Sequence, residues 1–418
     1  MERLLAHFFE KLIRDGALTV HFPSGRRIEA GDGTGNPVAI RFKSAADVRK
    51  FLANPELAFG ELYMDGGLTI EQGALYDAID MAIRNLALAS RPGWLKLLGR
   101  FRIALRGFRQ SNTPRSALAN IARHYDLDGR LYDLFLDSDR QYSCAYFTSP
   151  GQTLEDAQRA KKRHIAAKLL IGPGMGVLDI GCGWGGMALY LAGVCGADAE
   201  GITLSQEQFD MARARAAKAG LSRQARFRLT DYREIAGTFD RIVSVGMFEH
   251  VGVTQFKTYF QTIADRLAGD GVALVHSIGR TDGPGETNPW ITKYIFPGGY
   301  IPALSEIVPA AEKAGLIVTD VEVLRLHYAE TLKAWRERFE SHRGEAAALY
   351  DERFCRMWEF YLISSECTFR QGLAVVFQLQ LAKSPGTVPI TRDYIAAAEA
   401  GLREREAGMA RDGRQAAE

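Results

Sequence analysis

Short apolar runs alternate with segments of helical periodicity between about residues 150 and 383. The strand-like runs are VLDIG (177–181), AEGITLS (199–205), FDRIVSVG (239–246) and GVALVHSIG (271–279). Between them, residues 185–192 and 206–219 repeat apolar side chains with the period of a helix. Strands that alternate with helices predict an open, mostly parallel α/β sheet.

Residues 1–83 show the pattern of a small α+β unit. Glycine-rich turn signals separate two β-prone runs, 18–22 and 38–42, and helical periodicity follows at 45–52 and 75–83. The chain therefore divides into this unit, a linker (84–115), a large α/β domain (116–393) and a polar tail (394–418). The tail is rich in Ala, Glu and Arg, so we expect a helix that frays into solvent.

Composition narrows the class of protein. With 418 residues and 47% hydrophobic residues, the chain has the composition of a globular protein. Its net charge of +2 is too small to indicate binding to nucleic acid. The five cysteines are scattered without a CxxC pair, so we expect neither disulfides nor a metal site. The N-terminus carries acidic residues, unlike a signal peptide, and no run reaches about 18 apolar residues. These features predict a cytoplasmic protein.

The linker 84–115 holds eight basic residues and no acidic residue, interleaved with Trp94, Phe101, Phe108 and several leucines. Such a segment can lie on an anionic membrane surface, with its apolar side chains in the interface. A solvated interdomain helix is the alternative, and RNA binding ranks third because no other motif supports it. No nucleic-acid partner is expected.

The segment VLDIGCGWGG carries the sharpest chemical signal. Gly181, Gly183 and Gly186 satisfy GxGxxG, which by itself also fits a dinucleotide-binding turn or a turn without a ligand. Asp179 lies two residues before the first glycine, and this D-x-G-x-G pattern is typical of S-adenosylmethionine loops. Glycines let the backbone approach the ligand closely, and the Asp179 carboxylate can orient the methionine amino group.

The end of the second strand reads GITLSQEQ. Methyltransferases of this type usually carry an acidic residue there for the ribose hydroxyls, but this chain has Thr203. Gln208, one helical turn later, is the candidate ribose partner.

Together these segments resemble the cyclopropane-fatty-acyl-phospholipid synthases and the related mycolic acid cyclopropane synthases. The shared segments occur in family order: QYSCAYF (141–147), LDIGCGWGG (178–186), GITLSQEQ (201–208), FDRIVSVGMFEHVG (239–252), HSIG (276–279), IFPGGYIP (295–302), HYAETLKAW (327–335) and FYLISSECTFRQG (360–372). The resemblance implies a Rossmann-like class I methyltransferase domain preceded by a smaller α+β lipid-carrier-like domain.

The implied reaction adds a methylene from S-adenosylmethionine to a cis double bond of a phospholipid acyl chain. It passes through a carbocation and uses bound bicarbonate as the base. The family's bicarbonate ligands match Cys144, Glu249, His276, Ile278 and Tyr328. The expected cofactor contacts are Tyr142, Ser143, Asp179, Gly181, Cys182, Gly183, Thr203, Leu204, Ser205, Gln208, Asp231 and Tyr232. Aromatic rings that could stabilise the cation are Tyr142, Tyr146, Phe147 and Tyr300.

Each of these residues taken alone has an ordinary structural explanation, and only the joint match favours catalysis. The chain departs from the family at Ser365, where a cysteine is usual, and Glu366 is an extra carboxylate that could alter the base chemistry. The role of that cysteine is not transferred to Cys367.

Several alternatives stay open. Proton loss elsewhere would give a methyl-branched unsaturated chain instead of a ring. A small-molecule or RNA methyltransferase would share the glycine loop, and a lipid-binding protein would explain the N-terminal unit alone. The expected partners are a membrane phospholipid and the anionic inner face of the membrane, to which the protein would bind peripherally. A homodimer is compatible with these features.

Overall fold

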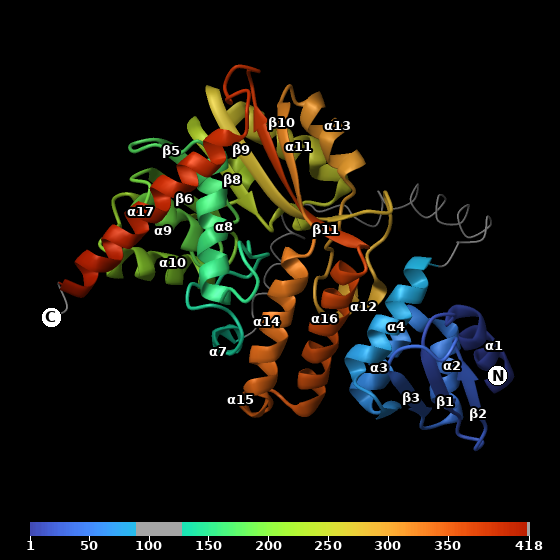
Figure 1. The fold of residues 1–418 in the computed structure, drawn as a ribbon. Helices are drawn as coiled ribbons and strands as arrows, with labels where there is room; N and C mark the ends of the chain where they lie inside the picture. Colours follow the sequence, from blue (N-terminus) through green and yellow to red (C-terminus); the bar gives the residue numbers. More distant parts are fainter. Residues whose placement is uncertain (89–127, 416–418) are drawn as a thin grey trace.

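The computed structural model describes residues 1–88 and 128–415, so the linker from residue 89 onward lies outside the described residues. A small N-terminal unit lies beside two long helices, α14 (His327–Ser341) and α16 (Glu352–Arg370), which stand below a large sheet (Figure 1).

The N-terminal unit is built on a four-stranded sheet of order β2-β1-β3-β4. β1 and β3 confirm the two predicted strands to within a residue, and α2 and α4 confirm the predicted helices. The elements are α1 (Glu2–Leu12), β1 (Ala17–His21), β2 (Arg27–Ala30), β3 (Pro37–Phe42), α2 (Ala45–Ala53), α3 (Pro55–Asp65), β4 (Leu68–Gln72) and α4 (Leu75–Leu88). Tilted and edge-on phenylalanines, including Phe9, Phe42 and Phe51, fill the core between sheet and helices.

The second sheet in the described part of the chain has seven strands in the order β10-β11-β9-β8-β5-β6-β7. Neighbours from β9 to β7 run parallel, whereas β11 is antiparallel to both β9 and β10. The strands are β5 (Gly176–Ile180), β6 (Asp198–Thr203), β7 (Ala225–Leu229), β8 (Phe239–Val245), β9 (Leu267–Arg280), β10 (Ile317–Leu324) and β11 (Ala374–Ala382). The mostly parallel α/β sheet predicted from the sequence is confirmed.

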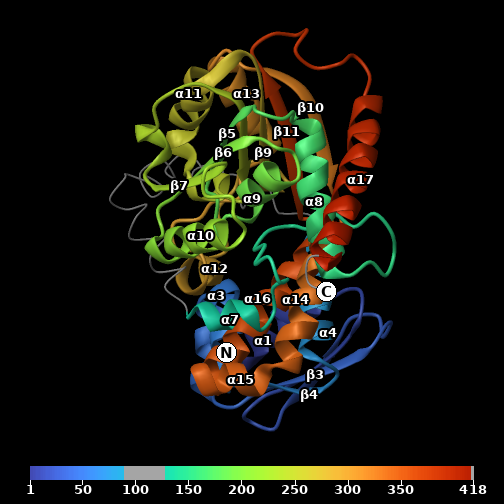
Figure 2. The same ribbon diagram turned by 90° about the vertical axis from the view of Figure 1, so that its left-hand side faces the viewer.

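Helices cover both faces of this sheet (Figure 2). On one face, an apolar cluster joins the strands to α8 (Leu154–Lys168), α9 (Gly186–Gly193) and α10 (Gln206–Lys218). On the other face, a second cluster joins them to α11 (Phe256–Arg266) and α13 (Leu304–Lys313). Successive residues of one strand enter opposite clusters, as Leu274 and Val275 of β9 do, because strand side chains alternate between faces.

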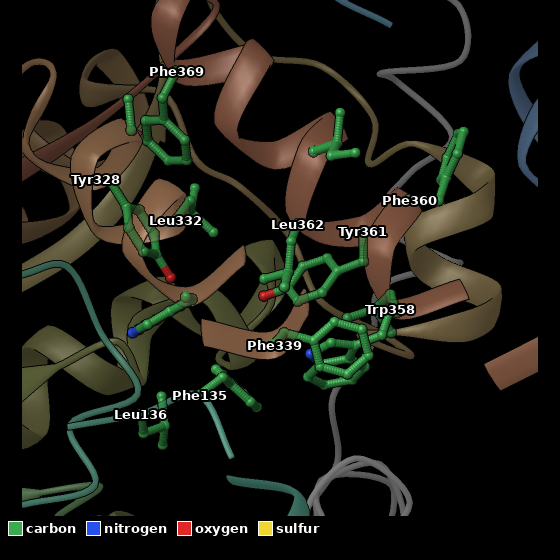
Figure 3. Packing of buried hydrophobic residues seen from close by; sticks show 14 of the residues in the cluster. Phe135, Leu136, Tyr328, Leu332, Phe339, Trp358, Phe360, Tyr361, Leu362 and Phe369 are labelled. Atoms are coloured by element: carbon green, nitrogen blue, oxygen red, sulfur yellow. The ribbon is translucent and has the colours of Figure 1, made fainter. Parts of the chain in front are cut away.

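A third cluster connects the large sheet to the N-terminal unit. Figure 3 shows side chains of α14, such as Tyr328 and Phe339, facing side chains of α16, such as Tyr361 and Phe369. Polar contacts tie α16 to the N-terminal unit: Tyr63 donates to Glu359 at 2.7 Å. The short elements nearby are α7 (Gly129–Asp133), α12 (Pro289–Tyr294) and α15 (Arg343–Leu349).

The C-terminal tail is helical, but the prediction that it frays into solvent was wrong. α17 (Asp393–Gln415) packs along α8 instead. Arg163 of α8 pairs with Glu406 at 2.5 Å, and His164 bonds Glu399 at 2.7 Å. Leu402, 8% exposed, joins the apolar cluster under α8, so this helix is an integral part of the sheet's cover.

Among the described residues, no helix is long and apolar enough to cross a membrane.

Gly60 of α3 lies directly against the indole ring of Trp290 in α12. A Cβ at this position would stand 2.4 Å from Nε1 and 2.6 Å from Cδ1 of that ring. We predict that Gly60→Ala lowers the free energy of unfolding by about 1–3 kcal/mol, because the buried indole must shift. Gly401→Ala is the control: it faces open space within α17 and should stabilise the protein by about 0.5–1 kcal/mol. Equal effects of the two changes in chemical denaturation would contradict the contact.

Candidate active site

A pocket opens at the carboxyl ends of β5, β6 and β8, where ligands bind in open α/β sheets. Of the predicted cofactor residues, Ser205 does not line this pocket. Its hydroxyl oxygen instead caps α10 by accepting from the backbone N–H of Gln208 at 3.3 Å. The predicted residues that do line it are Tyr142, Ser143, Asp179, Gly181, Cys182, Gly183, Thr203, Leu204, Gln208, Asp231 and Tyr232.

The glycine loop approaches the pocket with its backbone. Gly181 and Gly183 both have positive φ, at 79° and 54°, a region that side chains rarely adopt. A Cβ on Gly181 would stand 2.7 Å from the Met247 side chain, whereas one on Gly183 would meet nothing within 4 Å. The loop therefore forms a cradle whose open side at Gly183 belongs to the pocket.

Asp179 brings a buried carboxyl group into this pocket. It is 2% exposed, and its Oδ2 has no hydrogen-bond partner. Burial raises the pKa of Asp179 to about 7, although the charge of Lys161 opposes this shift. A cationic ligand group would offset the free-energy cost of burying this carboxylate, and the protonated amino group of S-adenosylmethionine is such a cation. The residues present thus fit the predicted cofactor.

The ends of β6 and β7 supply the polar groups expected near the nucleoside. Thr203 donates its hydroxyl to Oε1 of Gln208 at 2.8 Å, and both side chains are buried. This bond fixes the orientation of the Gln208 side-chain amide in the pocket wall, while its contact with the ribose stays a prediction. Asp231 accepts from Arg233 at 2.6–2.9 Å, so its carboxylate is held in place beside Tyr232.

The segment 141–143 forms another wall of the pocket, and two residues that the sequence analysis missed hold it there. Lys161 and Gln158, both on α8, are buried and hydrogen-bond to Gln141 and Ser143. A helix that carries a lysine among alanines gives no sign that the lysine is buried, so only the packing of α8 reveals it.

Glu249 and Ile278, two of the predicted catalytic residues, are in direct contact. The Ile278 amide donates to Oε1 of Glu249 at 2.7 Å, while Oε2 has no partner. Burial raises the pKa of Glu249 to about 7, so both protonation states are accessible near neutral pH.

His276 lies two residues before Ile278, on the same face of β9. Gln378, its partner on β11, donates to Nδ1 at 3.2 Å, which leaves the proton of the neutral ring on Nε2. Nε2 is buried without a hydrogen-bond partner, and burial holds the pKa of His276 well below its usual value. Gln378, rather than Glu249, orients this ring, and the sequence analysis missed it.

Cys144 and Tyr328 belong to the apolar cluster of α14 and α16. The Cys144 thiol donates to the Ala145 carbonyl at 3.3 Å, and burial raises its pKa, which keeps it protonated. The ring of Tyr328 packs edge-on against Trp335, at 5.8 Å between centroids, and at a tilt against Phe369, at 4.8 Å. The five predicted bicarbonate ligands do not line the described cofactor pocket, and the pair Glu249 and Ile278 is joined by a hydrogen bond.

The aromatic residues considered for the cation divide between two regions. Tyr142 stacks on Trp335 at 5.2 Å and shares a 3.0 Å hydroxyl contact with Tyr361. Tyr146 is stacked between His164 and His327. Tyr300 instead belongs to the cluster under α11 and α13, and its hydroxyl donates to Glu306 at 2.7 Å.

Near Ser365, where the chain departs from the family pattern, Glu366 and Cys367 have structural contacts. Glu366 accepts from Nε of Arg336 at 3.0 Å and from Nε of Arg370 at 2.8 Å. This carboxylate is committed to two cations, so it is unsuited to the base chemistry considered for it. Burial raises the pKa of Cys367 to about 12, so it is a packed thiol.

A family model described as Mycolic acid cyclopropane synthetase matches residues 112–379. The chain belongs to this family. A second model, described as a domain of unknown function, matches residues 4–90.

Two relatives and one solved structure show the same relationship. The chain is 41% identical over 283 residues to a probable fatty acid methyltransferase of Pseudomonas putida, covering 66% of this chain and 72% of the relative. It is 38% identical over 336 residues to the cyclopropane-fatty-acyl-phospholipid synthase of Escherichia coli (strain K12), covering 80% and 85%. It is similar to the structure of mycolic acid cyclopropane synthase CmaA1 complexed with SAH and CTAB, at 33% identity, a TM-score of 0.61 and coverage of 63% and 97%.

These findings confirm the class I methyltransferase fold and the family predicted from the motifs. The protein is an S-adenosylmethionine-dependent methyltransferase of the cyclopropane-fatty-acyl-phospholipid synthase type, which transfers a methylene or methyl group to fatty acyl chains.

We predict that Asp179→Asn weakens S-adenosylmethionine binding at pH 8 by about tenfold or more, because the buried carboxylate is lost. In the unchanged protein, affinity should fall by up to about tenfold per pH unit below pH 7, since protonation neutralises Asp179. Isothermal titration calorimetry across pH 5.5–8.5 measures both effects. The control is Asp210→Asn on the exposed face of α10; a pH dependence that survives in Asp179→Asn would contradict the assignment.

Proposed function

We propose that the protein adds a methylene from S-adenosylmethionine to cis double bonds of phospholipid acyl chains and makes cyclopropane fatty acids, with bicarbonate as the base. The observation that carries this proposal is a pair of buried, unpartnered polar atoms, Oε2 of Glu249 and Nε2 of His276. His276 belongs to β9, Glu249 is bonded to the backbone amide of Ile278 in the same strand, and neither residue lines the cofactor pocket. Buried polar atoms without partners are rare, so a small polar guest at this place is the natural explanation.

The names of the relatives support the acyl substrate. The Escherichia coli relative is a cyclopropane-fatty-acyl-phospholipid synthase, and the Pseudomonas putida relative is a probable fatty acid methyltransferase. The CmaA1 structure contains SAH.

When bound, S-adenosylmethionine supplies a methyl group on a sulfonium, which an alkene carbon takes as the carbon–sulfur bond breaks. The chain's own residues prepare this transfer. Asp179 would bind the cofactor's amino group, and the 141–143 wall would keep the methyl oriented. Tyr142, stacked on Trp335 beside the cofactor pocket, would supply the negative potential of its ring to the positive charge left on the second alkene carbon. The surrounding cluster excludes water, which would otherwise trap that cation.

A proton must leave the added methyl group for the ring to close, and Glu249 and His276 would hold the base that takes it. Nε2–H of His276 can donate to an anion, because Gln378 occupies Nδ1. Glu249 can donate when protonated and accept when ionised, since its pKa is about 7. Cys144 and Tyr328 would complete the ligand set.

The alternative product is a methyl-branched unsaturated chain, formed when the proton leaves a different carbon. The 41% identity to a probable fatty acid methyltransferase favours keeping this second candidate. Both reactions use the same cofactor pocket and differ only in where the base acts.

The substrate's location implies a peripheral association with the inner face of an anionic membrane. The basic, Trp- and Phe-bearing sequence 84–115 supports this part of the proposal. Only its first residues, Arg84 to Leu88, lie within the described part of the chain.

Product analysis tests the proposed reaction. The purified protein is incubated with S-adenosylmethionine and vesicles of anionic, cis-monounsaturated phospholipid, and the released acyl chains are examined by proton NMR. We expect high-field cyclopropyl protons and loss of vinyl signal. A retained vinyl signal with a new methyl would favour the branched product, and unmodified lipid would refute a phospholipid substrate. Vesicles of neutral lipid and added salt test the role of the anionic surface. Turnover should be slower in both cases, because the attraction between the basic segment and the lipid head groups is absent or screened.

We predict that His276→Ala and Glu249→Gln lower turnover on the same vesicles by about 100-fold or more, in line with the loss of a positioned acid or base. Both should leave the dissociation constant for S-adenosylmethionine nearly unchanged, because neither residue lines the cofactor pocket. Glu286→Gln, on an exposed loop, is the matched control. Equal losses of cofactor affinity in both variants would show that the two residues belong to the cofactor site instead.

A further inference from the structure

Lys161 on α8 is a fully buried cation that the proposed reaction does not use. Its side chain is 0% exposed, and burying a lysine without strong partners costs free energy. Lys161 places a buried positive charge next to the cofactor pocket, and the contacts of its ammonium group indicate its role.

The ammonium group of Lys161 bonds to side chains of the pocket wall 141–143. Nζ donates to Oε1 of Gln141 at 2.6 Å and to Oγ of Ser143 at 2.7 Å. Gln158, three residues earlier on α8, holds the same wall by its backbone: its amide donates to the carbonyls of Gln141 at 3.1 Å and Ser143 at 2.9 Å. Both partners of Lys161 are neutral, so its charge is not cancelled by the bonds it makes.

The charge of Lys161 acts on the groups that face it from every neighbouring element. On its own helix these include Lys162, and on the segment before α8 they are Asp137, Asp139 and Cys144. From the sheet they are Asp179 of β5 and His276 of β9. Among these, Asp179 stands out because its Oδ2 is buried, unpartnered and in the cofactor pocket, and Lys161 is the largest opposing charge that keeps it ionisable.

We propose that Lys161 is a positioning residue of the cofactor site, which fixes the 141–143 wall through Gln141 and Ser143 and favours the carboxylate form of Asp179. The inference rests on the cofactor site and not on the identity of the acyl product. Lys161 does not line the described cofactor pocket, and it supports cofactor binding through these three residues.

Two opposing electrostatic effects make this inference testable. Lys161 repels a cationic cofactor directly, but it also favours the Asp179 carboxylate that attracts the cofactor. Desolvation lowers the pKa of Lys161 to about 8, so it is largely charged at pH 7. We call the fall in cofactor affinity at low pH, where Asp179 takes up a proton, the acid limb of the affinity profile. If positioning dominates, removal of Lys161 weakens cofactor binding and moves this acid limb to higher pH. If repulsion dominates, removal strengthens binding.

The experiment is calorimetric titration of the full chain with S-adenosylmethionine from pH 5.5 to 8, without any lipid. For Lys161→Met we expect about tenfold weaker binding at pH 7. The acid limb should move upward by about one pH unit or more, because an opposing charge near Asp179 is gone. Lys161→Gln is the second variant, which should show the same movement of the limb if Lys161→Met does not fold.

Two controls separate charge from architecture. Gln158→Leu removes bonds to the same wall without removing a charge, so it should weaken binding and leave the acid limb where it is. Arg159→Met removes an exposed cation from the same helix and should change neither quantity. An unmoved limb in the Lys161 variants, tighter binding, or an equal movement in Gln158→Leu would each overturn the proposal. Because no acyl chain is present, failure of the proposed ring closure cannot produce any of these results.

Discussion

Ionisable side chains buried at the carboxyl edge of the central strands are the constraint on which this structure depends. Asp179, Glu249 and His276 are each less than a tenth exposed. An unpaired charge in such a place is costly, so burial shifts the pKa of each group toward its neutral form. Glu249 and His276 are in addition held by fixed hydrogen-bond donors. The Ile278 amide and the Gln378 side chain are donors of this kind, and both come from strands whose own ladders keep them rigid.

A continuous apolar cluster connects the site to the rest of the molecule. The apolar cluster of α14 and α16 reaches from the Tyr142 wall of the pocket to the N-terminal unit. Tyr361 of α16 contacts Tyr142, while Glu359 on the same helix accepts from Tyr63 of α3. One helix therefore seals the reaction side and anchors the small unit. The proposed transfer to a weakly nucleophilic alkene would need such an enclosure, because water would otherwise compete for the proposed cation.

Much of the fold could be predicted because local patterns agree with tertiary burial. β5, β8 and β9 each contain a mainly apolar run, as expected for parallel strands that are buried on both faces. β2, β4, β7, β10 and β11 were not predicted. The first three are short and expose half or more of their residues, whereas β11 is a buried apolar run that the sequence analysis missed. α17 was expected to fray because its composition is polar, yet those charges pair with Arg163 and His164 across the interface.

The sequence by itself determined the glycine loop, its acidic residue and the order of the family motifs, because these depend on residue types at fixed short spacings. It therefore also indicated the cofactor. Only the tertiary structure decided which polar groups lie buried and what they contact: Lys161 behind Ser143, Gln378 beside His276, and Glu366 between two arginines. Most of these partners are far apart in the chain, and Lys161 and Glu366 look like ordinary surface positions in the sequence. Desolvation and pairing arise only when helices close over the sheet, so no local pattern can encode them.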